Sequence, residues 1–381
     1  MSGSHHVPAL PLGIQRPTLL LDKDKAIRNI EKMAGKARKS AVRFRPHFKT
    51  HRSAGIAEWF REFGVDAIAV SSLDMAAYFA DHGWGDITVA FPVNLLEIDK
   101  VNSLAAEIAL GLLVESEEAV QFVAAHLSHR VSAWVEVDTG YGRTGVQWDR
   151  PDEIVELAQA VVATDRLAFK GLLTHAGHSY HAASKLELDA IHHDSVARLA
   201  YVRAALRAGG FSQVQLSSGD TPTCSVVDDF TGLDEIRPGN FVFYDLRQVR
   251  IGSCSEREIA VAVACPVVAK HPQRNEIVLY DGAVHLSKDS LISADRTPTF
   301  GHVAFWEGDG WGPSLPDTYV SSLSQEHGIV RTTVDVLEQV HVGDVLIVVP
   351  VHSCLLSYLL HDYHTLDGEI IPSQSTVGVA T

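Results

Sequence analysis

The residues with the clearest potential for chemistry lie in the segment 45–51, which reads Arg-Pro-His-Phe-Lys-Thr-His. This segment follows the apolar-alternating run 41–44, so Lys49 is expected at the C-terminal end of a strand. An amine that aromatic and imidazole neighbours shield from water loses its proton more readily, and the neutral amine can attack a carbonyl group. The competing interpretation is a solvated surface charge, because most lysines in such positions are exposed.

A second segment, 138–145, is a glycine-spaced loop that reads Asp-Thr-Gly-Tyr-Gly-Arg-Thr-Gly. It follows the apolar run 131–137, so it is expected at the end of a strand, where it projects Arg143. The alternative role for Arg143 is an ion pair with Asp138 that anchors the loop.

A third loop, 174–180, reads Thr-His-Ala-Gly-His-Ser-Tyr and closes another apolar run. A single histidine in such a place is more often a hydrogen-bonded core residue than a catalyst. Here His175, His178 and Tyr180 share one loop, and this clustering favours a functional site.

Small hydroxyl and glycine residues mark two more loops, 217–223 (Ser-Ser-Gly-Asp-Thr-Pro-Thr) and 237–240 (Arg-Pro-Gly-Asn). Such residues let backbone N–H groups approach an anion closely, and barrel proteins often bind phosphate at the loops of their last two strands. Thr221, Gly239 and Asn240 are therefore predicted phosphate contacts. Taken singly, each loop could also be an ordinary turn.

The last candidate pair, His352 and Cys354, follows the apolar run 345–350. On an extended strand, residues two apart share a face, so both side chains could bind one ion from the same side. Imidazole and thiolate suit Zn²⁺ best among common ions, with Mn, Co or Mg as further possibilities, and two protein ligands leave positions open for water and substrate. The competing interpretation of Cys354 is a small buried apolar residue.

Strands must carry these loops, and apolar strand-like runs alternate with helical stretches between residues 23 and 250. This pattern predicts an α/β fold, a (β/α)8 TIM barrel in which reactive groups converge from the C-terminal ends of the strands. A doubly wound open sheet is the structural alternative, because periodicity does not show closure. The eight predicted runs are 42–48, 67–71, 87–91, 110–114, 131–137, 167–174, 214–217 and 240–244.

Beyond residue 250 the pattern changes to strand-like runs with turn signals between them. We therefore predict a mostly β domain at 251–381, joined by a strand from about residues 10–22. This domain would carry His352 and Cys354.

Composition narrows the class of protein. The chain has 381 residues, 46% of them hydrophobic, which is enough for a barrel and a smaller domain. A net charge of -15 without a basic cluster argues against a nucleic-acid partner. The chain has no run of about 18 apolar residues and no leader pattern, so we expect no membrane partner and a cytoplasmic location. The four cysteines lack paired spacing, which favours reduced thiols.

Together these motifs resemble the fold-type III pyridoxal-phosphate enzymes, in the branch that contains D-serine dehydratase, D-threonine aldolase and D-threo-3-hydroxyaspartate dehydratase. The branch has an alanine racemase-like barrel, and the resemblance runs from about residue 17 to residue 366. It includes Ser-Gln-Glu-His-Gly at 324–328, where Gln325 replaces the glutamate that is common in the family. The other matching segments are 46–51, 138–143, 175–180 and 352–354.

The resemblance implies a role for each motif. Lys49 would carry pyridoxal 5'-phosphate as a Schiff base, Arg143 would lie near the phenolic oxygen of the cofactor, and His175 would lie on the face of its ring. The remaining implied contacts are Tyr180 and Tyr244 with the cofactor, and His352 and Cys354 with a divalent metal ion.

The implied activity is that of a lyase that converts a D-3-hydroxy amino acid, namely D-serine, D-threonine or D-threo-3-hydroxyaspartate, to a 2-keto acid and ammonia. The Lys49 amine would remove the Cα proton, and the metal would bind the β-hydroxyl group as it leaves. Cys354 favours dehydration, because D-threonine aldolases usually have aspartate at this place. By analogy, the protein would be a homodimer that acts on a small molecule.

Three alternatives remain. The first is a D-threonine aldolase, in which retro-aldol cleavage gives glycine and an aldehyde and His178 is the base at the β-hydroxyl group. The others are an amino-acid racemase and a non-catalytic carrier of pyridoxal phosphate.

Overall fold

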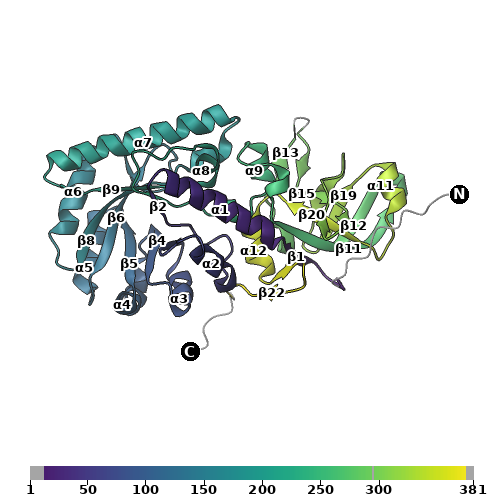
Figure 1. Ribbon diagram of the computed structural model, residues 1–381, viewed down its shortest axis with the longest axis horizontal. Coiled ribbons are helices and arrows are strands. Elements are labelled where there is room, and N and C mark those ends of the chain that lie inside the picture. The colour runs from purple at the N-terminus through teal and green to yellow at the C-terminus, as the bar shows by residue number, and fades with distance from the viewer. Residues whose placement is uncertain (1–12, 294–295, 375–381) are drawn as a thin grey trace.

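The computed structural model describes residues 13–293 and 296–374, and most of its strands lie in two large sheets. Figure 1 shows these sheets side by side, with helix α1 (Lys23–Lys39) lying across the region between them. The first strand, β1, belongs to the second sheet. Strands β2 to β10 then form the first sheet, and the later strands complete the second.

The first sheet is a parallel barrel of eight strands. Its first and last strands are joined through the segment after β2, where the N–H group of Phe48 donates to the carbonyl oxygen of Ala69 at 2.9 Å and the N–H group of Ala69 donates to that of Pro46 at 3.0 Å. The predicted TIM-barrel class is therefore confirmed, and the open sheet is excluded. Around the barrel the strands are β2 (Arg43–Phe44), β10 (Glu235–Ile236), β9 (Gln215–Ser218), β8 (Leu167–Leu173), β6 (Val131–Asp138), β5 (Ala109–Val114), β4 (Asp86–Pro92) and β3 (Ile68–Val70).

Helices cover the outside of this barrel because each has an apolar face at helical spacing. In α1 the side chains of Ala26, Ile30, Met33 and Ala37 recur every three or four residues and are buried. A serine precedes each of four helices, and its side chain accepts a hydrogen bond from the backbone N–H group three residues ahead. The remaining covering helices are α2 (Ala54–Arg61), α3 (Leu73–Asp81), α4 (Ile98–Glu107), α5 (Glu117–His126), α6 (Pro151–Val162), α7 (Lys185–Ala208) and α8 (Thr221–Val226).

The eighth strand is not where the sequence pattern places it. The prediction of a strand at 240–244 is wrong, because Asn240–Val242 forms a 3-10 helix and the eighth strand is β10. Phe241, Val242 and Phe243 are fully buried in the core. In the sequence, their apolar run is indistinguishable from a buried strand. The loop 237–240 consequently follows the strand and lies at the C-terminal edge of the barrel.

The second sheet closes on itself and is then extended. Strand β11 pairs with both β12 and β20, so six strands form a ring, and β1 lies against β11 on the other side. Residues 10–12 of the predicted joining segment lie outside the described residues. The ring consists of β12 (Glu276–Tyr280), β19 (His327–Arg331), β18 (Tyr319–Leu323), β15 (Gly301–Ala304), β20 (Val345–Pro350) and β11 (Val261–His271), and its extension of β1 (Thr18–Leu21), β21 (Tyr363–Thr365) and β22 (Ile370–Ile371).

Short helices accompany the second sheet: α9 (Leu246–Arg250), α10 (Ala283–Leu286), α11 (Val334–Gln339) and α12 (Ser353–Leu360). Helix α12 directly follows β20 and brings its first turn to the open end of the barrel (Figure 1). Within 13–293 and 296–374, no helix has the length and apolar character needed to cross a bilayer.

Candidate active site

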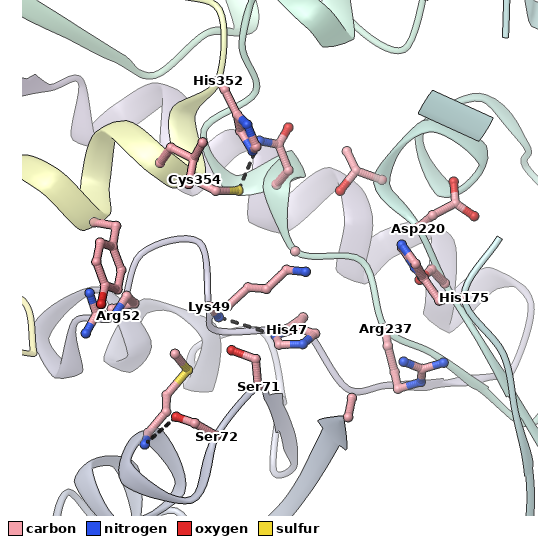
Figure 2. A pocket seen from close by; sticks show the side chains of 18 of the residues that line it. His47, Lys49, Arg52, Ser71, Ser72, His175, Asp220, Arg237, His352 and Cys354 are labelled. Carbon is pink, nitrogen blue, oxygen red and sulfur yellow. Dashed lines mark hydrogen bonds between the residues drawn. The ribbon is translucent and has the colours of Figure 1, made fainter. Parts of the chain in front are cut away.

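A cavity of about 1430 Å³ lies between the C-terminal ends of the barrel strands and helix α12. Loops after six barrel strands line it, together with Asp289 and residues of α12 (Figure 2). Nine of the predicted site residues are among the lining residues: Lys49, Arg143, His175, Tyr180, Thr221, Gly239, Asn240, His352 and Cys354.

Lys49 is held in the cavity by the aromatic residue before it. The ring of Phe48 packs in the core with ring-centre distances of 4.9 Å to Phe60, 5.0 Å to Phe79 and 5.1 Å to Trp84. This anchor fixes the turn 48–51, and Figure 2 shows the Lys49 side chain extending from it into the cavity. The Lys49 side chain is exposed to the cavity, although the surrounding protein still lowers the pKa of its amine.

The electrostatic surroundings favour a neutral Lys49 amine. Burial lowers the pKa of Lys49, and Arg143 and Arg237 add to this effect against an opposing contribution from Cys354. The same burial lowers the pKa of His47 well below its ordinary value, with Lys49 as a further cause. The protonated forms of His47 and Lys49 are thus both disfavoured. An amine with a lowered pKa is suited to nucleophilic attack.

Gly239 lies where a side chain does not fit. A Cβ atom at this position would stand 2.8 Å from the carbonyl oxygen of His47 and 3.2 Å from the hydroxyl oxygen of Thr50. The loop after β10 therefore passes directly over the lysine segment. The absence of a side chain permits this close contact, and Gly239 also lines the cavity.

The loop after β6 presents Arg143 to the cavity. The Asp138 carboxylate accepts N–H groups from Gly140 and Tyr141, each at 2.8 Å, and from Gly142 at 3.0 Å. Among the described residues the recorded contacts of the Asp138 carboxylate are these backbone hydrogen bonds, without an ion pair to Arg143. The carboxylate shapes the loop, and the guanidinium stays free for the cavity, 5.5 Å from the ring centre of Tyr141.

The loop after β8 supplies a neutral imidazole and a protonated phenol. His175 Nδ1 lies 3.3 Å from the carbonyl oxygen of Gly219, and burial lowers the pKa of His175 to about 3. Burial also raises the pKa of the Tyr180 phenol, whose side chain hydrogen-bonds Thr221. Both groups therefore offer hydrogen bonds and ring contacts without charge.

Two predicted site residues do not line the cavity. His178, expected as a base, lies on the other side of its 3-10 turn, next to Gly140 and Arg198. Tyr244, expected as a cofactor contact, is 1% exposed, and its hydroxyl pairs with the Ser225 hydroxyl at 3.0 Å. In both cases backbone turns after a strand end direct the side chain away, which sequence spacing does not reveal.

The predicted phosphate contacts meet at one edge of the cavity. Thr221 begins helix α8, and its hydroxyl accepts the N–H group of Phe241 at 3.2 Å. The Asn240 amide donates to Asp245 at 2.9 Å and to Ser353 at 2.7 Å, so it ties this loop to helix α12. A phosphate contact from Asn240 would therefore come from its backbone.

His352 and Cys354 lie together, but not on a strand. Strand β20 ends at Pro350, His352 caps helix α12, and Cys354 is in its first turn, so the expected extended geometry is wrong. The His352 ring hydrogen-bonds the Cys354 side chain (Figure 2). On its other side, Nδ1 lies 2.6 Å from a carboxylate oxygen of Asp289. The pair converges because His352 keeps an extended backbone and the chain bends into the helix at Ser353, directly before Cys354.

This arrangement has the chemistry of a metal pair. A carboxylate that holds the second ring nitrogen is typical support for a metal-binding histidine. Despite burial, the contacts with Asp289 and Cys354 raise the pKa of His352. The described residues contain no cluster of three or more histidine, cysteine or acidic side chains placed for metal binding, so an ion here would have two protein ligands.

Among the lining residues that were not predicted from the sequence are Arg52, Glu136, Arg237 and Asp289. Burial lowers the pKa of Arg237 to about 10, and its Nε donates to Ser217 at 2.7 Å. Burial also raises the pKa of Glu136. Charged residues in apolar strand ends could have signalled Glu136 and Arg237. No local pattern marks Asp289, because it meets His352 across 63 residues of chain.

Two family models match the chain. Residues 21–246 match "Alanine racemase, N-terminal domain", and residues 260–366 match "Putative serine dehydratase domain". The chain is 29% identical to D-threo-3-hydroxyaspartate dehydratase of Delftia sp. (strain HT23), with 94% of this chain and 96% of that protein covered. It is 27% identical to 3-hydroxy-D-aspartate aldolase of Paracoccus denitrificans, over 94% of this chain and 91% of that protein.

The fold comparison agrees. The solved structure of the Delftia dehydratase superposes with a TM-score of 0.89 at 27% identity, and the match covers 96% of this chain and 99% of that one. A cysteine-to-alanine mutant of the same dehydratase has been solved in a metal-free form.

Proposed function

We propose, from the membership of this chain in the alanine racemase N-terminal domain family, that it is a pyridoxal-phosphate- and metal-dependent lyase. Its substrates would be D-3-hydroxy amino acids, which lose water and then ammonia to give a 2-keto acid. One observation carries the proposal: the Lys49 amine and the His352–Cys354 pair face the same cavity from different walls (Figure 2).

The cavity fits pyridoxal phosphate. Lys49 would hold its aldehyde carbon, and the loop residues Gly239 and Thr221 line the edge of the cavity where its phosphate would lie. The uncharged His175 ring and the free Arg143 guanidinium flank the same space. When bound, the cofactor supplies an electron sink that stabilises negative charge at Cα of the substrate.

The residues around the cavity would have separate roles in the reaction. The Lys49 amine, whose pKa is lowered by burial and by Arg143 and Arg237, would take the Cα proton. His352 and Cys354 would hold a divalent metal, zinc by ligand type, which would act as a Lewis acid at the β-hydroxyl group. Asp289 would orient the His352 ring by holding Nδ1.

Retro-aldol cleavage is the second candidate, because an aldolase is among the relatives. That reaction needs a base at the β-hydroxyl group, and His178, the residue predicted for it, does not line the cavity. Cys354 and the position of His178 therefore favour dehydration. A racemase would have no use for the His352–Cys354 pair, and a non-catalytic carrier would not need a cavity that extends to it.

The test is an assay of the cofactor-loaded protein with D-serine, D-threonine and D-threo-3-hydroxyaspartate, with and without a chelator. We expect keto acid and ammonia from at least one substrate, loss of turnover with chelator, and loss of both turnover and cofactor absorbance in Lys49→Ala. Glycine and an aldehyde from D-threonine would instead establish the aldolase. We further propose a homodimer and a cytoplasmic location, which sedimentation and cell fractionation can test.

A further inference from the structure

Besides Lys49, Arg143 and Arg237, the cavity contains Arg52, a buried cation that pairs with no acidic group of the described residues. Arg52 is only 6% exposed, yet it lines the cavity. Its Nε and Nη1 atoms are buried and have no hydrogen-bond partner in 13–293 and 296–374. Its guanidinium instead lies over the ring of Tyr358, 4.3 Å from the ring centre.

This arrangement is unfavourable without an external anion. Burial lowers the pKa of Arg52, and the groups that oppose this effect are Tyr358, Tyr363 and Tyr78 rather than carboxylates. A guanidinium nevertheless stays charged in a protein. Removing a charge from water costs free energy unless the charge is paired, and contact with an aromatic face offsets only part of that cost.

The backbone at Arg52 is also held in an uncommon conformation. Its φ angle is 51°, in the left-handed region that residues with a side chain rarely adopt. Two hydrogen bonds fix it there, from its own N–H group to Phe48 at 3.0 Å and from the N–H group of Gln374 to its carbonyl oxygen at 2.6 Å. Such strain concentrates at functional sites.

Arg52 lies one helical turn from the metal pair. Cys354 and Tyr358 are four residues apart on α12 and so share a face of it. The segment after Lys49 follows that face, with the Thr50 hydroxyl 3.3 Å from the Cys354 sulfur and Arg52 over Tyr358. Figure 2 shows Arg52 on the opposite side of Lys49 from Arg237. The cation is therefore next to the metal pair and lies across Lys49 from Arg237.

We propose that Arg52 receives a second substrate carboxylate, the one that Cβ bears in a 3-hydroxy dicarboxylic amino acid. This inference rests on the proposed function. With Cα at Lys49 and the β-hydroxyl group at His352 and Cys354, the remaining substituent on Cβ extends along α12 toward Arg52. That substituent is hydrogen in D-serine, methyl in D-threonine and carboxylate in D-threo-3-hydroxyaspartate. Guanidinium and carboxylate match in charge and in paired hydrogen bonds.

The test compares Arg52→Gln and Arg52→Lys with a matched control, Arg61→Gln. Arg61 also stacks on an aromatic ring, 4.0 Å from the centre of Trp84, but it pairs with Glu58 and does not line the cavity. We expect Arg52→Gln to raise KM for D-threo-3-hydroxyaspartate by about 10- to 100-fold. KM for D-serine should stay within about threefold, Arg52→Lys should show a smaller rise with the same selectivity, and Arg61→Gln should match wild type.

Equal KM changes for both substrates, or no change for either, would overturn the proposal. Calorimetry on the cofactor-loaded protein gives a readout that does not need turnover: D-malate should bind more tightly than D-lactate, and Arg52→Gln should abolish the difference. If the wild type turns over no hydroxy amino acid but shows this difference, the proposed function fails and the carboxylate site stands. If Arg52→Gln does not fold, the selectivity of Arg52→Lys decides.

Discussion

At the scale of single residues, the reactivity of Lys49 depends on what surrounds it. The sequence identifies the amine, but its basicity is set by burial and by two arginines from distant loops. Arg143 comes from the loop after β6, and Arg237 from the loop after β10. The barrel brings these charges together because the C-terminal ends of all eight strands face the same side.

A lowered pKa for Lys49 has a measurable consequence. In the cofactor-free protein, the rate of pyridoxal-phosphate uptake should rise with pH to a midpoint below the ordinary lysine pKa of 10.5. Loss of a neighbouring positive charge raises the pKa of an amine, so Arg143→Gln should move the midpoint to higher pH. Arg247→Gln is the control, because Arg247 lines the cavity but is not among the charges that lower this pKa. A wild-type midpoint equal to that of free Nα-acetyl-lysine would contradict the argument.

At the scale of elements, the loop after β6 depends on one carboxylate. The Asp138 carboxylate accepts hydrogen bonds from the backbone N–H groups of Gly140, Tyr141 and Gly142. The sequence left open an ion pair between Asp138 and Arg143 as the anchor of this loop. The structure shows that Asp138 anchors the loop through backbone hydrogen bonds instead, so Arg143 can face the cavity.

Removing that carboxylate should therefore affect catalysis more than folding. Hydrogen bonds to a charged group are worth about 1.5–3 kcal/mol, so Asp138→Ala should lower kcat/KM by roughly 10- to 100-fold as the loop loses its geometry. Because the loop is largely at the surface, the melting temperature should change little. Asp138→Asn keeps an acceptor oxygen and should recover most of the activity. Equal losses in the two variants would point to the charge of Asp138 rather than to loop shape.

At the scale of the whole molecule, the site exists only because the two sheets meet. Lys49 belongs to the barrel, whereas His352 and Cys354 enter on α12 from the second sheet. Contacts between the halves support the lysine segment directly. The Tyr363 hydroxyl, on β21, donates to the carbonyl oxygen of His51 at 2.7 Å.

Tyr363→Phe should weaken this connection. Tyr363 is fully buried, so the substitution leaves the His51 carbonyl oxygen without that donor at a cost of about 1–3 kcal/mol. We expect a lower midpoint of thermal unfolding and weaker retention of the cofactor, measured by melting curves and by dialysis. Tyr201→Phe is the control, because Tyr201 is 53% exposed on helix α7. An unchanged midpoint in Tyr363→Phe would show that this hydrogen bond does not stabilise the contact between the halves.

The sequence by itself determined the barrel and indicated Lys49 as the candidate amine. Seven of the eight predicted strand runs overlap barrel strands, because buried parallel strands leave continuous apolar runs that can be recognised locally. The motifs at their ends converge for a general reason, since parallel strands in a closed barrel end at one face. The prediction of the eighth strand was wrong because residues 241–243 are fully buried, although they lie within and just after a 3-10 helix. Their apolar run looks the same in the sequence as that of a buried strand.

Only the tertiary structure decided which side chains point into the cavity and which partners they have. His178 and Tyr244 turn away from it, Asp289 reaches His352 across 63 residues, and Arg52 lacks a carboxylate partner among the described residues. These facts depend on side-chain direction and on contacts between distant segments. Local periodicity records burial, but the position of a charge relative to its partners is fixed only when the two sheets pack together.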